Sequence, residues 1–250
     1  MTRPHLGLIV PPAAGAVPVD GPLLYGDRIR FSARGLGLGE ISTRGYVEVI
    51  DAVIGKAREL AAEGVQAVSL MGTSLSFFRG AAFNRELQAE LTRATGLPSS
   101  TMSDAIVNGL RSLDVKRVAV ATAYIDEVNL LLRRYLADSG FEPLAIQGLS
   151  ISDVQAVANV PTGVLVDLCR AAYKASPGAD GILISCGGLV TLDAVREVEA
   201  EVGAPVVSSS PAGFWDLVRC AGLDPRATGH GRLFAQNVSA VRPPAGSTAP

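Results

Sequence analysis

The sequence predicts an α/β protein with parallel sheet, organised as two similar halves. Short runs rich in Val, Ile and Leu alternate with helical patterns along most of the chain. The runs are continuously apolar, which is typical of parallel strands covered on both faces. The same order of features also occurs twice, which favours an internal repeat. The five predicted strands span residues 6–12, 65–72, 116–123, 181–186 and 204–210.

Amphipathic helices are predicted between these strands. In residues 46–64 an apolar stripe recurs at helical spacing, and Gly64 is placed to end the helix. Residues 124–140 repeat the pattern with leucines, a valine and a tyrosine on one face. Strands alternating with such helices predict the α/β class.

The repeat suggests where the chain divides. Residues 67–78 and 181–192 share one form, a strand followed by a pivot and small residues, with Gly72 and Cys186 as the pivots. We expect one half over residues 1–114 and the other over 115–210, with the last helix, about 211–224, a candidate member of the first half. Residues 236–250 are rich in Pro, Ala, Ser and Gly, and we expect them to be disordered.

Composition narrows the class of protein. Hydrophobic residues make up 48 % and charged residues 18 %, which is typical of a globular chain. No apolar run reaches the roughly 18–20 residues of a membrane helix. A net charge of −2 without a basic stripe argues against nucleic acid and membrane partners. The chain has three cysteines, which do not form a paired disulfide framework, and its sequence shows no export signal. Both features favour a cytoplasmic location for the protein. The oligomeric state stays open, with a monomer favoured.

Histidine is scarce, and this limits the chemistry. The chain has two histidines, His5 and His230, and neither lies at a metal-ligand spacing from a cysteine or another histidine. We therefore expect no metal site. The usual general base is almost missing, so catalysis would rest on cysteine, hydroxyls, carboxylates or backbone groups.

The predicted strands end in small and polar residues. Ligands of open parallel sheets bind at the carboxyl ends of the strands. Glycines there let backbone N–H groups approach a ligand, and helix N-termini favour negative charge. Two facing loops of this kind would hold a carboxylate or an enolate, whereas nucleotide-binding motifs are absent. The strand ends carry Pro11 and Pro12, Gly72, Thr73 and Ser74, Tyr124, Cys186, Gly187 and Gly188, and Ser208, Ser209 and Ser210.

Structural roles compete with functional ones at these positions. Cys186 closes a strand before two glycines, so it is either a small buried hydrophobe or a thiol presented for chemistry. Cys169 and Cys220 lie within helical patterns, where we expect core packing. Thr73 and Ser74 could cap the next helix, and Tyr124 could be a core tyrosine.

Several long segments resemble a known family. Residues 8–21, 68–84, 118–129, 181–194 and 206–216 are closely similar to arylmalonate decarboxylases, cofactor-free lyases of the aspartate/glutamate racemase superfamily. The resemblance covers nearly the whole chain to about residue 235. It implies two similar α/β units with the active site in the cleft between them.

The resemblance also assigns roles to residues. It makes Cys186 the proton donor and Gly72 the counterpart of a second cysteine that the racemases carry, which favours a decarboxylase. Ile41 and Val157 stand where a relative has valine and methionine, which leaves the substrate scope open. The dioxyanion hole for the retained carboxylate would comprise Thr73, Ser74, Tyr124 and Gly187. Leu38, Ile41, Tyr46, Val154 and Val157 would form an apolar pocket, and Pro12, Gly72 and Gly188 would complete the cleft.

The expected activity is therefore decarboxylation of a small dicarboxylate. A 2-aryl or 2-aryl-2-alkyl malonate would give an enantiopure 2-arylcarboxylic acid through an enediolate protonated by Cys186, without metal or cofactor. Two alternatives stay open. One is a racemase or a maleate-type cis–trans isomerase, in which Cys186 would be a nucleophile. The other is a binding protein for small acids that releases no CO₂.

Overall fold

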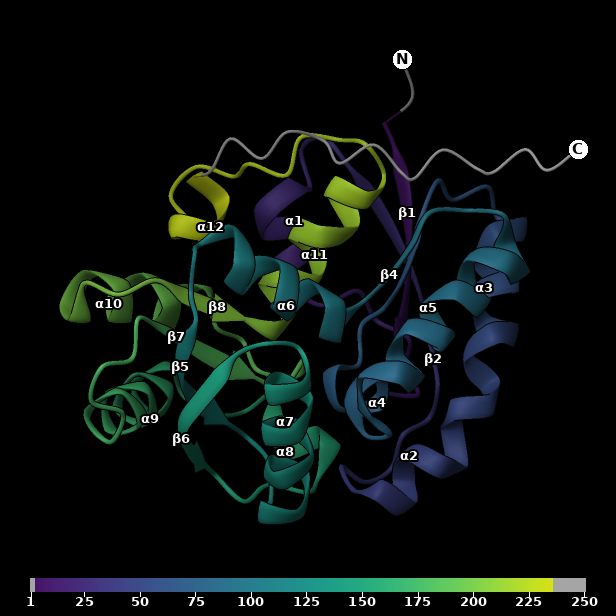
Figure 1. The fold of residues 1–250 in the computed structure, drawn as a ribbon. Coiled ribbons are helices and arrows are strands. Elements are labelled where there is room, and N and C mark those ends of the chain that lie inside the picture. Colours follow the sequence, from purple (N-terminus) through teal and green to yellow (C-terminus); the bar gives the residue numbers. More distant parts are fainter. Residues whose placement is uncertain (1–2, 236–250) are drawn as a thin grey trace, which may run out of the picture.

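Two four-stranded parallel sheets form the frame of the protein in the computed structural model, which describes residues 3–235 (Figure 1). The strand orders are β2-β1-β3-β4 and β6-β5-β7-β8, and all pairings are parallel. The predicted α/β class is thus confirmed. The strands are β1 His5–Val10, β2 Arg30–Gly35, β3 Val68–Leu70, β4 Ser99–Thr101, β5 Arg117–Thr122, β6 Glu142–Gly148, β7 Gly181–Ser185 and β8 Val206–Ser208.

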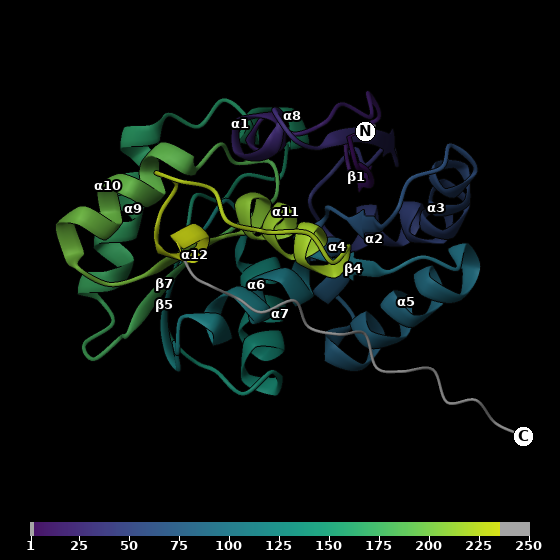
Figure 2. The same cartoon turned by 90° about the horizontal axis from the view of Figure 1, so that it is seen from above.

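Helices cover the outer faces of the sheets and fill the space between them. In the view from above, α3 and α5 flank one side of the molecule, α9 and α10 flank the other, and α6 and α11 lie between (Figure 2). The helices are α1 Asp20–Tyr25, α2 Thr43–Val49, α3 Val53–Ala62, α4 Thr73–Phe77, α5 Gly80–Thr95, α6 Met102–Ser112, α7 Asp126–Asp138, α8 Val154–Val157, α9 Thr162–Lys174, α10 Leu192–Val202, α11 Ser209–Cys220 and α12 Arg232–Ala235.

Three strands and one helix break differ from the sequence-based expectations. The edge strands β2 and β6 and the hydroxyl-rich β4 were not predicted. Strands β2 and β6 are half-exposed and carry polar residues, and β4 is buried but consists of two serines and a threonine, so none of the three has a typical apolar run. The helix predicted over residues 46–64 begins earlier, at Thr43, and a 3₁₀ turn at Ile50–Ala52 divides it into α2 and α3.

Strand register relates the two sheets position by position. Ile9 pairs with Leu70 across β1 and β3, and Ala121 pairs with Ile184 across β5 and β7. Leu70 and Ile184 are therefore equivalent positions in the two sheets. Gly72 and Cys186 each follow two residues later, and so they occupy matching places at the carboxyl ends of matching strands.

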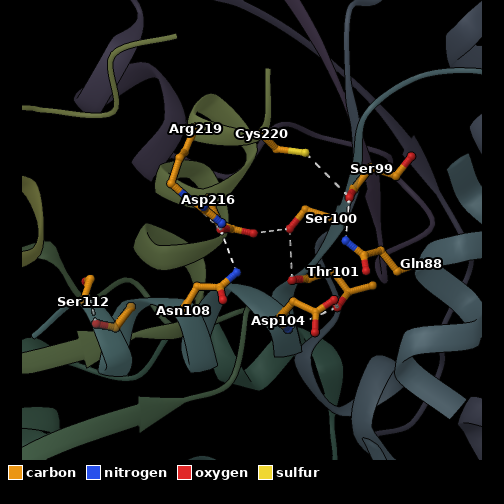
Figure 3. Close-up of polar contacts among 11 residues, drawn as sticks. Gln88, Ser99, Ser100, Thr101, Asp104, Asn108, Ser112, Asp216, Arg219 and Cys220 are labelled. Carbon is orange, nitrogen blue, oxygen red and sulfur yellow. Dashed lines mark hydrogen bonds and ion pairs between the residues drawn. The ribbon is translucent and has the colours of Figure 1, made fainter. Parts of the chain in front are cut away.

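Helix α11 follows β8 in the chain but packs chiefly against α6, β4 and α1. Asp216 on α11 is 2 % exposed and accepts hydrogen bonds from three side chains (Figure 3). Its carboxylate accepts from the hydroxyl of Ser100 at 2.5 Å, from the amide of Asn108 at 3.0 Å and from the guanidinium of Arg219 at 2.5 Å. Because Ser100 lies on β4 and Asn108 on α6, this buried carboxylate joins α11 to elements of residues 1–114.

Two further properties bear on function. Among residues 3–235 no helix is both long and apolar enough to cross a bilayer. Within the same range no three His, Cys, Asp or Glu side chains gather in a way that could hold a metal ion. The tail predicted to be disordered, residues 236–250, lies outside the described residues.

We predict that Asp216→Ala lowers the free energy of unfolding by about 3 kcal/mol. Removing one partner of a buried ion pair costs about 3–5 kcal/mol, and Arg219, with a side chain 15 % exposed, can partly turn to solvent. Urea denaturation followed by circular dichroism measures the change. The control is Asp193→Ala, which removes an exposed partner of Arg196 and should cost about 1 kcal/mol or less. Equal losses in the two variants would contradict the structural role of Asp216.

Candidate active site

A cavity of about 250 Å³ lies where the carboxyl ends of strands from both sheets converge. Its lining comes from residues that follow β1, β2, β3, β6, β7 and β8, as expected for ligand sites of parallel sheets. Most of the predicted site residues meet there. Those that line the cavity are Pro12, Leu38, Ile41, Gly72, Thr73, Ser74, Val154, Val157, Cys186, Gly187 and Gly188.

Tyr46 and Tyr124, the two remaining predicted residues, lie behind this lining and are both fully buried. Burial raises the pKa of each phenol well above its ordinary value, so both stay protonated and able to donate. The Tyr124 hydroxyl lies beside Thr73 and Cys186 and accepts a hydrogen bond from Ser185 at 3.4 Å. The Tyr46 hydroxyl lies near Ser74 but has no hydrogen-bond partner of ordinary geometry.

Cys186 presents its thiol at the end of β7 and is 6 % exposed. Its backbone N–H donates to the hydroxyl of Ser209 at 3.3 Å, and its carbonyl accepts from the N–H of Leu189 at 3.3 Å. Burial raises the pKa of the thiol to about 11, although the backbone of Gly188 and the Tyr124 hydroxyl partly oppose the rise. Near neutral pH this residue is therefore a protonated thiol that can donate.

Thr73 and Ser74 begin α4, directly after Gly72. The Thr73 hydroxyl donates to the sulfur of Met102 at 2.8 Å. Its carbonyl accepts from the hydroxyls of Ser76 and Ser103, each at 2.9 Å. These buried contacts fix the start of α4, where Thr73 and Ser74 line the cavity.

Space around the cavity glycines is tight. A Cβ atom on Gly187 would lie 2.7 Å from the sulfur of Met102, so a side chain there would force Met102 to shift. A Cβ on Gly72 would lie 3.0 Å from a terminal methyl of Leu75 and 3.2 Å from Pro11. The backbone of Gly72 is extended, with φ −130° and ψ 97°, so a side chain could enter after a small shift of Leu75.

The apolar end of the cavity is closed by segments from both halves. The N–H of Ile41 donates to the carbonyl of Ser152 at 2.8 Å, and Glu40 forms an isolated antiparallel bridge with Asp153. These contacts bring the lining residues Leu38 and Ile41 to the same end as Val154 and Val157.

Asp20 and Ser210 also line the cavity, and the sequence analysis did not assign them to it. Each is 1 % exposed, and Asp20 Oδ1 and Ser210 Oγ have no hydrogen-bond partner. Burial raises the pKa of Asp20 to about 6, and the nearby Ser210 hydroxyl partly opposes the rise. Ser210 belongs to the hydroxyl cluster at the end of the fifth predicted strand, but nothing local marked Asp20.

The other two thiols lie away from the cavity. Cys169 is buried within α9, and burial raises its pKa to about 12. Cys220 ends α11 and donates to the carbonyl of Ser99 at 3.7 Å. Among the described residues, Cys186 is thus the one thiol that faces the site.

Comparisons with known proteins identify the family of the chain. The model of the family described as arylmalonate decarboxylase matches residues 6–234. An arylmalonate decarboxylase of Bordetella bronchiseptica is 57 % identical over 237 residues, which are 94 % of this chain and 98 % of that protein. A liganded crystal structure of an arylmalonate decarboxylase variant, with one glycine-to-cysteine and one cysteine-to-serine exchange, superimposes with a TM-score of 0.91. It is 56 % identical and covers 92 % of this chain and 98 % of its own.

A second group of relatives is more distant. The maleate isomerase structure from Pseudomonas putida has a TM-score of 0.87 at 24 % identity, over 93 % of this chain and 98 % of its own. At that identity the likeness shows a shared fold alone.

We predict that iodoacetamide alkylates Cys186 at pH 8 at least about tenfold more slowly than it alkylates a free cysteine. With a pKa of about 11, roughly 0.1 % of the thiol is ionised at that pH, against about a quarter of a free thiol. Peptide mass spectrometry over time gives the rate, with glutathione as the reference. The rate should rise as the pH approaches 11. Fast alkylation at pH 7 would show an ionised thiol and contradict the protonated state.

Proposed function

The chain belongs to the arylmalonate decarboxylase family and is a carboxy-lyase, and we propose that it converts 2-aryl and 2-aryl-2-alkyl malonates to single enantiomers of 2-arylcarboxylic acids. The observation that carries the proposal is a difference between two equivalent positions at the cavity. Cys186 supplies a protonated thiol, whereas Gly72 has no side chain. The partner molecule is thus a small dicarboxylate.

The retained carboxylate would bind to the donors at the start of α4 and after β7. Thr73, Ser74 and the N–H of Gly187 line the cavity, and the buried Tyr124 hydroxyl lies beside Thr73. As CO₂ leaves, negative charge spreads onto this carboxylate. Fixed donors aimed at the developing charge lower the barrier, and loss of one such donor costs about 3–4 kcal/mol in a comparable site. The Thr73 hydroxyl would turn from Met102 to the ligand.

The departing carboxylate would lie at the apolar end of the cavity. Val154 and Val157 from one half and Leu38 and Ile41 from the other surround it with hydrocarbon, with Tyr46 behind them. A carboxylate is poorly stabilised there, whereas CO₂ is neutral. The surroundings therefore favour breaking the C–C bond, which leaves its electron pair in the enediolate.

Cys186 would complete the reaction. The enediolate is planar, and the thiol transfers its proton to the carbon from one face. The resulting thiolate regains a proton from solvent, so the cycle needs no other reactant. Since Gly72 places no acid at the matching position, only one enantiomer forms.

A racemase or a maleate-type isomerase fits the site less well. A two-cysteine racemase needs a thiol at each pivot, and Gly72 supplies none. Nucleophilic attack needs a thiolate, whereas burial holds the pKa of Cys186 near 11. The shared fold with maleate isomerases does not offset these features.

We predict that Cys186→Ser keeps the fold but lowers kcat roughly a hundredfold to ten-thousandfold, because general acid catalysis contributes about that much. The test measures CO₂ release from phenylmalonate, with near-ultraviolet circular dichroism to verify folding. Cys169→Ser is the matched control and should retain turnover per folded molecule. Undiminished activity of Cys186→Ser would rule out the thiol as the acid.

We also predict that the natural sequence, run in D₂O with 2-methyl-2-phenylmalonate, gives one enantiomer carrying one deuteron at the α-carbon. Chiral chromatography and mass spectrometry measure handedness and label together. A racemic product would mean that protonation occurs from solvent on both faces, against the proposal. A binding protein without lyase activity would release no CO₂ at all.

A further inference from the structure

We propose that Asp20 and Ser210 form a second polar subsite of the cavity, which binds a hydroxyl or amino group carried on the aryl group of the substrate. The inference rests on the proposed function of the same cavity. It adds a determinant of substrate choice that lies apart from the reacting carboxylates.

The first support is the state of the two side chains. Both are 1 % exposed and line the cavity, yet Asp20 Oδ1 and Ser210 Oγ have no hydrogen-bond partner of ordinary geometry, although the two side chains lie close enough for the Ser210 hydroxyl to lower the pKa of Asp20. Buried polar atoms in folded proteins nearly always have partners. Two such atoms from two different helices, adjacent to each other and at the lining of a cavity, are arranged for a partner that enters the cavity.

The internal repeat provides the second support. Thr101 pairs with Leu70, and Ser208 pairs with Ile184, so Ser103 and Ser210 are equivalent positions two residues later. The Ser103 hydroxyl has hydrogen-bond partners within the protein, since it donates to the carbonyl of Thr73 and accepts from the hydroxyl of Ser76. The Ser210 hydroxyl has no hydrogen-bond partner of ordinary geometry, and its polar neighbour is the Asp20 carboxylate at the same cavity. The Ser210 hydroxyl therefore does not hold neighbouring elements together as the Ser103 hydroxyl does.

The third support is position. Asp20 opens α1 and Ser210 lies in the first turn of α11, and these helices pack together. In Figure 1 they lie toward the top of the molecule, whereas α8, which carries Val154 and Val157, lies toward the bottom. The subsite and the apolar pocket for the departing carboxylate thus occupy different ends of the cavity. With the reacting carbon near Cys186, the end at Asp20 is left for the aryl group.

The chemistry of the pair selects the ligand group. At pH 7.5 an Asp20 carboxylate accepts hydrogen bonds from O–H or N–H groups, and the Ser210 hydroxyl can donate to a ligand oxygen. The same carboxylate repels the carboxylates of the malonate, which favours binding with both of them at the other end. The cavity also has apolar lining residues that suit a ring, among them Pro12, Val17, Pro18, Val19 and Val190.

The test uses non-reacting ligands and the full chain. Isothermal calorimetry at pH 7.5 compares 3-hydroxyphenylacetate and 4-hydroxyphenylacetate with phenylacetate and with the matching methoxy ethers, which lack the donor. We expect at least one hydroxy compound to bind about tenfold or more tightly than both references. Equal affinity of all five ligands for the wild type would overturn the proposal without any variant.

Variants then test whether the preference for hydroxylated ligands depends on Asp20 and Ser210. Asp20→Leu and Ser210→Ala should each reduce the hydroxyl preference severalfold, whereas Ser69→Ala, which changes a buried serine outside the cavity lining, should retain it. A preference that survives in both cavity variants would place the subsite elsewhere and refute the assignment. Absence of CO₂ release from phenylmalonate with the ligand preference intact would refute the proposed function and leave the subsite standing.

Discussion

The burial of one thiol at the junction of two similar halves is the constraint on which the site depends. The matching sheets bring Gly72 and Cys186 to equivalent strand ends, so any difference between the two positions becomes a difference between two sides of one cavity. Burial keeps the Cys186 thiol protonated, because a thiolate would lose its hydration there. Under the proposed function, an acid on one side and none on the other would give a product of one handedness.

Contacts far from the thiol hold this arrangement. Ser209, at the start of α11, accepts the backbone N–H of Cys186, and Asp216, two turns along the same helix, ties α11 to β4 and α6. The position of the thiol therefore depends on packing between the halves as well as on β7. On the opposite wall, Ser76 and Ser103 fix the start of α4 beneath Thr73. The site is rigid because buried hydrogen bonds from both halves hold its backbone.

The central features could be predicted from the sequence because they are local. Continuous apolar runs marked β1, β5 and β7, and the residues after them marked the cavity, including Cys186. The half-exposed edge strands β2 and β6 have no such pattern, and tertiary pairing decides them. The paired burial of Asp20 and Ser210 was missed for a related reason. Their adjacency arises from packing of α1 on α11, which no short stretch of sequence records.

The position of the thiol is tested most directly by moving it. The double variant Gly72→Cys, Cys186→Ser places the acid on the other side of the cavity, where the extended backbone at position 72 accepts a side chain after a small shift of Leu75. Chiral chromatography of the 2-phenylpropionate formed from 2-methyl-2-phenylmalonate measures the outcome. The account predicts the opposite enantiomer from that of the natural sequence, at a reduced rate. A folded, active double variant that retains the original handedness would contradict it.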